Sequence, residues 1–84
     1  MRRYGLTKGI VFRPELFGGL LFVPHRSLIV ELNPSAYKII QMVAEGSSEE
    51  DMVAASDFES SSQIIDFLLK LEQSEIIEEV GVEG

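Results

Sequence analysis

The sequence predicts a small α+β domain of winged-helix-like order, with three short N-terminal antiparallel strands followed by three helices. Residues 9–32 carry apolar runs separated by glycine, proline and polar turn residues, which is typical of short strands. Residues 34–71 instead repeat apolar side chains at i, i+3, i+4 and i+7, which is typical of helices. The chain of 84 residues is long enough for one core, so residues 1–84 are expected to form a single domain.

The three strands are expected at Gly9–Pro14, Phe17–Pro24 and Leu28–Leu32, and a polar turn joins the second to the third. The pair Gly18-Gly19 lies inside an apolar run, where glycine indicates a β-bulge or a close backbone approach. In the third strand Ile29 and Glu31 lie on one face. Its other face carries Leu28, Val30 and Leu32. We expect at least two of these three side chains to lie in the core.

Each helix has a recognisable start. Asn33 can accept hydrogen bonds from the first free amides of a helix, and Pro34 suits its first position. This helix is expected to end at Gly46, with Ala36, Ile39, Ile40 and Val43 as its buried stripe. Ser47 and Glu50 match a capping box, so a second helix is expected to begin there and to run to about Ala55. Ser60 and Gln63 match another capping box, which is expected to begin the third helix.

The third helix is apolar over more than one face. Its core stripe is Ile64, Phe67, Leu68 and Leu71, and a second stripe of Ile65 and Leu69 lies about 100° around the helix. Either this helix is wedged between the sheet and other helices, or it keeps apolar surface for a ligand. Beyond it, Ile76, Ile77 and Val80 predict a short strand or an extended tail, and residues 1–8 and 81–84 are expected to fray.

Composition excludes several kinds of site. There is no cysteine and only one histidine, His25, so disulfides, thiolate sites and multi-histidine metal sites are excluded, and no catalytic constellation or cofactor motif is present. The longest apolar run, Leu20–Val23, is too short to span a bilayer and no export signal is found, so a cytoplasmic protein is expected. Residues 1–42 carry a net charge of +4 and residues 43–84 a net charge of −11, and the acidic half should repel nucleic acid.

Two rival functions follow from the predicted order of elements. The second and third helices could form the helix-turn-helix of a DNA-binding regulator, but the third begins with polar residues and has Lys70 as its one basic side chain. The chain could also be a small dimerising module, because an exposed strand edge can accept a second copy of itself.

An ordered set of residues resembles the PqqD-like peptide chaperones, which recognise the leaders of ribosomally made precursor peptides. The resemblance covers about residues 10–78, and its Phe-Gly-x-Leu element looks like the mycofactocin-type members. The residues that carry it are Phe17-Gly18-Gly19-Leu20-Leu21-Phe22, Glu31-Leu32-Asn33, Ala36, Ile39, Ile40, Gly46, Phe67, Leu68, Leu71 and Ile76.

The resemblance implies a non-catalytic protein that needs no metal or cofactor. Its leader peptide would add as a strand to the edge of the third strand, with side chains entering a groove against the third helix. The peptide-binding residues implied are Leu28, Ile29, Val30, Glu31, Leu32, Ile64, Ile65, Leu68, Leu69 and Glu72. The implied partners are the precursor peptide and a separate radical S-adenosylmethionine or other peptide-modifying enzyme, whose iron-sulfur cluster this chain lacks the cysteines to hold.

Overall fold

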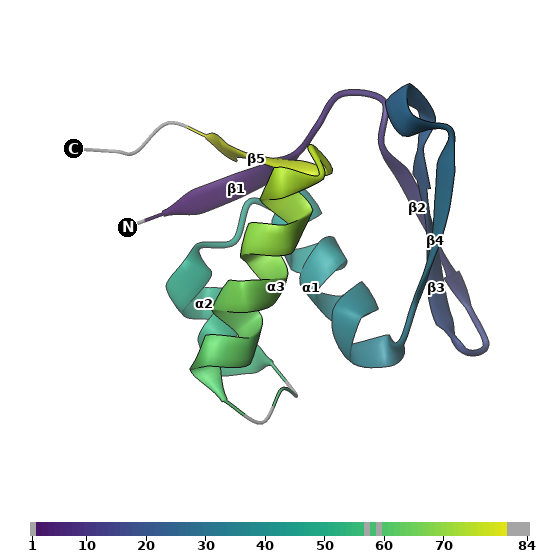
Figure 1. Cartoon of the computed structure of the whole chain (residues 1–84). Helices are drawn as coiled ribbons and strands as arrows, with labels where there is room; N and C mark the ends of the chain where they lie inside the picture. The colour runs from purple at the N-terminus through teal and green to yellow at the C-terminus, as the bar shows by residue number, and fades with distance from the viewer. Residues whose placement is uncertain (1, 57, 59, 81–84) are drawn as a thin grey trace.

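The computed structural model describes residues 2–56, 58 and 60–80, and these form an α+β fold of two antiparallel sheets and three helices (Figure 1). The predicted fold class is confirmed. In chain order the elements are β1 (Arg3–Leu6), β2 (Val11–Glu15), β3 (Gly18–Val23), the 3-10 turn η1 (Pro24–Arg26), β4 (Leu28–Leu32), α1 (Pro34–Ala44), α2 (Glu49–Ala55), α3 (Ser61–Gln73) and β5 (Ile77–Val80).

The larger sheet has the order β2-β3-β4, so β2 and β4 are its two edges. Figure 1 shows the helices on one side of this sheet and none on the other. We call these sides its inner and outer faces. The inner face supplies Leu21, Val23 and Leu32, which are buried, and it packs against α1. The outer face, set by the same strand register, presents Val11, Arg13, Leu20, Phe22, Ile29 and Glu31.

The smaller sheet pairs the two ends of the described chain. β1 runs antiparallel to β5, with Tyr4 opposite Glu79 and Leu6 opposite Ile77. The expectation that residues 1–8 fray is therefore wrong for Arg3–Leu6, because Tyr4 is buried and all four residues pair with β5. Burial also raises the pKa of the Tyr4 hydroxyl. The strand predicted around Ile77 is confirmed, whereas residues 81–84 lie outside the described part.

The helix starts follow their predicted caps with one exception. Asn33 Oδ1 accepts from the amide of Ala36 at 2.8 Å, and Ser60 Oγ accepts from the amide of Gln63 at 3.4 Å. For α2 the cap is Ser48 and not Ser47, and its Oγ accepts from the amide of Asp51 at 3.1 Å. The Ser47 amide instead donates to Met42 O at 3.0 Å, which closes the end of α1 and takes Ser47 out of the capping position.

The core lies between the inner face of the larger sheet, α1, α3 and the β1–β5 pair. The predicted α1 stripe is buried in full, and the α3 stripe is buried at Ile64, Leu68 and Leu71, while Phe67 is half-buried against it. Tyr4 and Met52 add further buried volume from β1 and α2. α3 is therefore held by its neighbours along a single stripe.

The glycine pair makes a close approach and not a bulge, because the register of β3 continues without interruption through Gly18 and Gly19. A Cβ on Gly19 would collide with the Tyr37 ring of α1. A Cβ on Gly18, whose φ is +141°, would collide with the backbone where β4 passes into α1. Both glycines therefore allow α1 to lie directly on β3.

Replacing Gly19 by alanine should lower the free energy of unfolding by about 1–3 kcal/mol, because the added methyl group overpacks the Tyr37 ring. Urea denaturation of Gly19→Ala and the parent measures this change. In a Tyr37→Leu background the same substitution should cost distinctly less, since the ring is gone. Equal costs in both backgrounds would contradict the close approach.

Candidate functional site

The edge of β4 is the first feature of the candidate site. β4 pairs with β3 on one side and has no strand on the other within the described residues. A strand edge of this kind exposes backbone N–H and C=O groups that can pair with another chain. The opposite edge, β2, contains Pro14, which lacks an amide hydrogen, so β4 offers the more complete edge.

The side chains of β4 divide between the core and the surface. Leu32 is buried and Val30 packs partly against the core, as expected of two residues on that face. Leu28, on the same face, is 43% exposed. On the outer face Ile29 is 61% exposed and Glu31 is exposed. Leu28, Ile29, Val30 and Glu31 therefore offer surface beside the free edge.

The second feature is α3, which has one flank on each side of its buried stripe. The first flank carries Ile65, Leu69 and Glu72, and Glu72 lines a hollow together with Thr7 and Ile77. This flank therefore faces β1 and β5. Figure 1 shows α2 and β1 on one side of α3 and β4 on the other. The flank turned towards β4 is consequently the second one, made of Gln63, Phe67 and Lys70 at i, i+4 and i+7.

The predicted α3 site residues are thus not brought to β4. Ile64 and Leu68 are core residues, and Ile65, Leu69 and Glu72 lie on the flank turned away from the free edge. Ile65 and Leu69 remain partly exposed, so α3 is not wedged on all sides. The apolar pattern identifies two stripes, but their assignment to β1 or β4 depends on the rotation of α3 in the packed domain.

A hollow of about 410 Å³ lies on the flank of α3 turned towards β4. Phe58, just before α3, stacks on Phe67 with ring centroids 5.8 Å apart. Lys70 forms no ion pair within the described residues, so its ammonium is available to a ligand. The hollow is therefore aromatic on one side and charged at its rim. Its lining residues are Phe58, Gln63, Asp66, Phe67 and Lys70.

A second hollow, of about 390 Å³, lies at the C-terminal end of β4. It is lined by Phe17, Glu31, Leu32 and Asn33. Phe17 comes from the turn between β2 and β3 and is about half exposed. A chain lying along β4 would therefore run from the turn at η1 to this hollow.

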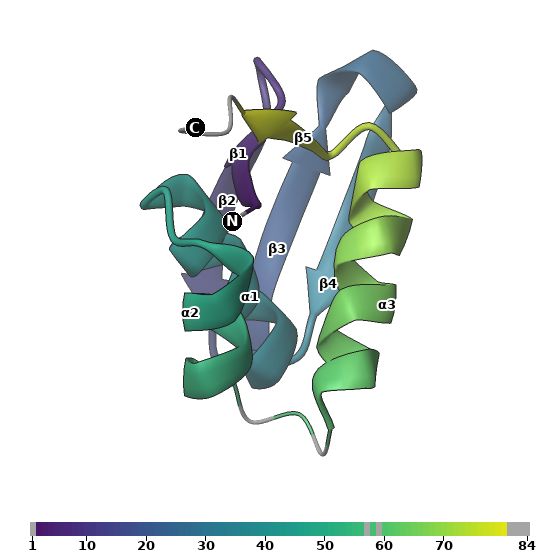
Figure 2. The same cartoon turned by 90° about the vertical axis from the view of Figure 1, so that its left-hand side faces the viewer.

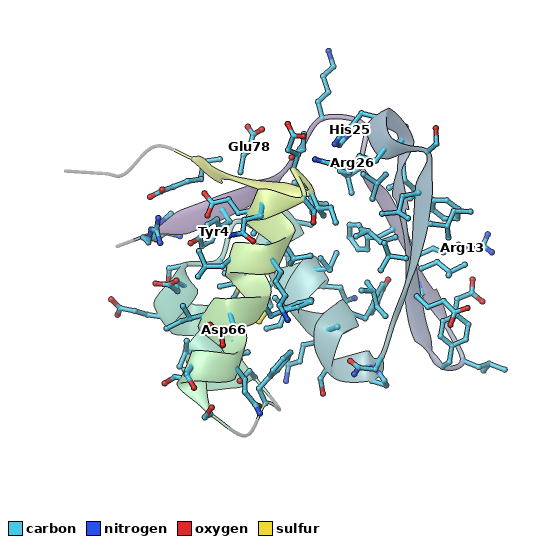
Figure 3. The ribbon with its side chains drawn as sticks, viewed as in Figure 1. Tyr4, Arg13, His25, Arg26, Asp66 and Glu78 are labelled. Carbon is cyan, nitrogen blue, oxygen red and sulfur yellow. The ribbon has the colours of Figure 1, made fainter. Side chains whose placement is uncertain are left out.

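Arg26 ties the start of β4 to the end of α3. Its Nε donates to Ser74 O at 2.9 Å, and its guanidinium lies 2.7 Å from the Glu75 carboxylate. Figure 3 shows Arg26 reaching from the turn above the sheet towards the end of α3. The sequence predicts only a polar turn between β3 and β4, and that prediction missed the contact by which Arg26 joins the two elements that border the candidate site.

Figure 2 shows β4 and α3 on the same side of the molecule and with similar axis directions, and Figure 1 shows that the two elements are separated from each other. α1 contacts β4, while α3 contacts β5 and α2. The candidate site is the strip of surface between the free edge of β4 and the Phe67 flank of α3. Within the described part of the chain no three His, Cys, Asp or Glu residues are grouped to hold a metal ion.

Comparisons with protein-family models, with curated proteins and with solved structures found no match. Among the residues that the structure describes, no helix is both long and apolar enough to cross a membrane. The geometry of the site and the residues of the sequence thus carry the functional argument.

Replacing Arg26 by alanine should lower the free energy of unfolding by less than about 1 kcal/mol, because its ion pair is exposed. Amide hydrogen exchange should nevertheless speed up locally around Ser74 and Leu28, since the tie between α3 and β4 is lost. Arg2→Ala, which removes an exposed pair with Glu79 at the other end of the molecule, is the matched control. The same exchange pattern in both variants would contradict a local role for Arg26.

Proposed function

We propose that this chain is a non-catalytic peptide chaperone, which binds the leader of a ribosomally made precursor peptide by strand addition to β4. The observation that carries the proposal is the free edge of β4 on the same side of the molecule as α3, whose flank turned towards β4 has an aromatic hollow. A free edge supplies backbone hydrogen bonds to any extended chain, and a hollow beside it supplies side-chain selectivity.

Strand addition would use the two faces of the peptide differently. Alternate side chains of an added strand point to opposite faces of the sheet. Those on the inner side would lie against Leu28, Val30 and the Phe58–Phe67 pair, with Lys70 near the rim. Those on the outer side would lie beside Ile29 and Glu31. The peptide is thus expected to carry apolar residues at alternate positions.

The proposed site keeps the predicted strand and changes the predicted helix face. Its contact residues are Leu28, Ile29, Val30 and Glu31 on β4 and Phe58, Phe67 and Lys70 beside α3. Leu32, Ile64 and Leu68 support these residues from the core. Arg26 holds the two walls in position through Ser74 and Glu75.

The wider role is proposed from the resemblance to PqqD-like chaperones. The protein would present its bound precursor to a separate modifying enzyme in the cytoplasm, of the radical S-adenosylmethionine class or another class. This chain has no cysteine, so the thiolate-bound cluster of a radical enzyme would lie on that separate partner. A DNA-binding role has less support, because Lys70 is the one basic residue of α3.

Phe67→Ala should weaken binding of a fluorescently labelled leader peptide by about tenfold or more, since it removes half of the aromatic pair beside β4. Leu69→Ala, on the opposite flank of the same helix, is the matched control and should leave the affinity unchanged. Fluorescence anisotropy titrations measure both affinities, and thermal unfolding by circular dichroism checks that each variant is folded. Weakening by Leu69→Ala with none by Phe67→Ala would contradict this placement of the site.

A further inference from the structure

The outer face of the β2-β3-β4 sheet is a second surface, which adjoins the proposed peptide site and shares Ile29 and Glu31 with it. No helix covers it in Figure 1, and its side chains form two rows across the three strands. The first row is Val11–Phe22–Ile29 and is wholly apolar. Val11 is 56% exposed and Ile29 61% exposed. Exposed apolar surface of this kind on a small domain indicates an interaction surface.

The second row is Arg13–Leu20–Glu31, with opposite charges at its two ends. Figure 3 shows Arg13 projecting from the sheet on the side away from the helices. Its guanidinium lies 5.8 Å from the centre of the Phe22 ring and pairs with Glu15 at 2.6 Å, which holds it over this face. Glu31 forms no ion pair within the described residues.

We infer that the outer face binds a second copy of this chain, in a symmetric dimer whose two-fold axis runs along β3. This rotation places β2 of one copy over β4 of the other. Arg13 then meets the partner copy's Glu31 at both ends of the second row, while Leu20 meets Leu20. In the first row Phe22 meets Phe22 and Val11 meets Ile29. The pattern is therefore complementary to itself, which a two-fold interface requires.

The distribution of charge also favours this surface. The chain carries a net charge of −7, and twelve of its fourteen acidic residues lie in residues 43–84, the part of the sequence that contains α2 and α3. Residues 9–33 contain two basic and two acidic residues and are neutral. Contact through the outer face, whose charged residues are Arg13, Glu15 and Glu31, therefore joins the less acidic sides of two copies and keeps α2 and α3 of the two copies apart.

The size of the face predicts a weak dimer. From the usual strand spacing and rise, three strands of this length cover roughly 300 Å², against about 800 Å² per partner in a standard stable interface. The dimer should therefore form with rising concentration. Its geometry leaves both β4 edges at the outside of the assembly, so each copy could still accept a peptide.

Charge exchange tests this interface with the full chain. Sedimentation equilibrium from about 1 μM to about 1 mM should show a monomer–dimer equilibrium for the parent protein. Arg13→Glu or Glu31→Arg alone should weaken self-association by about tenfold or more, because like charges then face each other. A mixture of the two single variants should associate again. In the mixed dimer the introduced Glu of one variant faces the introduced Arg of the other, and the unchanged Glu31 of the first faces the unchanged Arg13 of the second.

A parent protein that stays monomeric throughout the concentration range would overturn the inference. So would a dimer that neither single variant weakens, or a mixture of the two variants that does not associate. Phe22→Lys should also abolish the dimer, because it places two ammonium groups at the axis. The dimer and the peptide site can fail independently. Phe22→Lys should keep the parent's affinity for the leader peptide, whereas loss of peptide binding in Phe67→Ala should leave the dimer intact.

Discussion

The fold depends on the close approach of α1 to β3 at Gly18 and Gly19. The Tyr37 ring occupies the space that a side chain at Gly19 would fill, and the passage from β4 into α1 occupies the space next to Gly18. The Tyr37 ring also meets Phe12 of β2 edge to face at 5.8 Å, so one α1 side chain packs across two strands. Asn33 then caps α1 directly after the last residue of β4.

This arrangement makes β4 an edge strand with an open side. Since α1 follows β4 immediately and folds back over the inner face, the chain supplies no further strand beside β4 in its described part. The end of α3 is fixed by β5, which pairs with β1, and by Arg26, which links Ser74 and Glu75 to the start of β4. The strip between β4 and α3 is therefore produced by the packing of the whole domain. No single motif encodes it.

Much of this fold can be predicted from the sequence, because the relevant information is local. The alternation in residues 28–32, the Asn33 cap and the i, i+3, i+4, i+7 stripe of α1 each depend on nearby residues. β1 is different, since Arg3–Leu6 is short and becomes a strand only by pairing with Ile77–Val80 at the other end of the chain. The cap of α2 moved by one residue because Ser47 closes α1.

The candidate site could be predicted only in part for the same reason. An edge strand follows from the order of elements, and the structure keeps Leu28–Glu31 accessible there. The helix wall depends on which neighbours lie on each side of the buried stripe Ile64, Leu68 and Leu71, and that is settled only in the packed domain. The contact between Phe58 and Phe67 could not be predicted from the sequence, because Phe58 lies between two helices and Phe67 follows it by nine positions.

The central claim is that a peptide adds to β4 as a strand, and amide hydrogen exchange followed residue by residue by NMR tests it most directly. On saturation with a leader peptide, alternate amides within Leu28–Leu32 should become strongly protected, because every second amide points away from β3. The intervening amides should change little, since they already pair with β3. Peptide binding that leaves the exchange of all β4 amides unchanged would contradict strand addition.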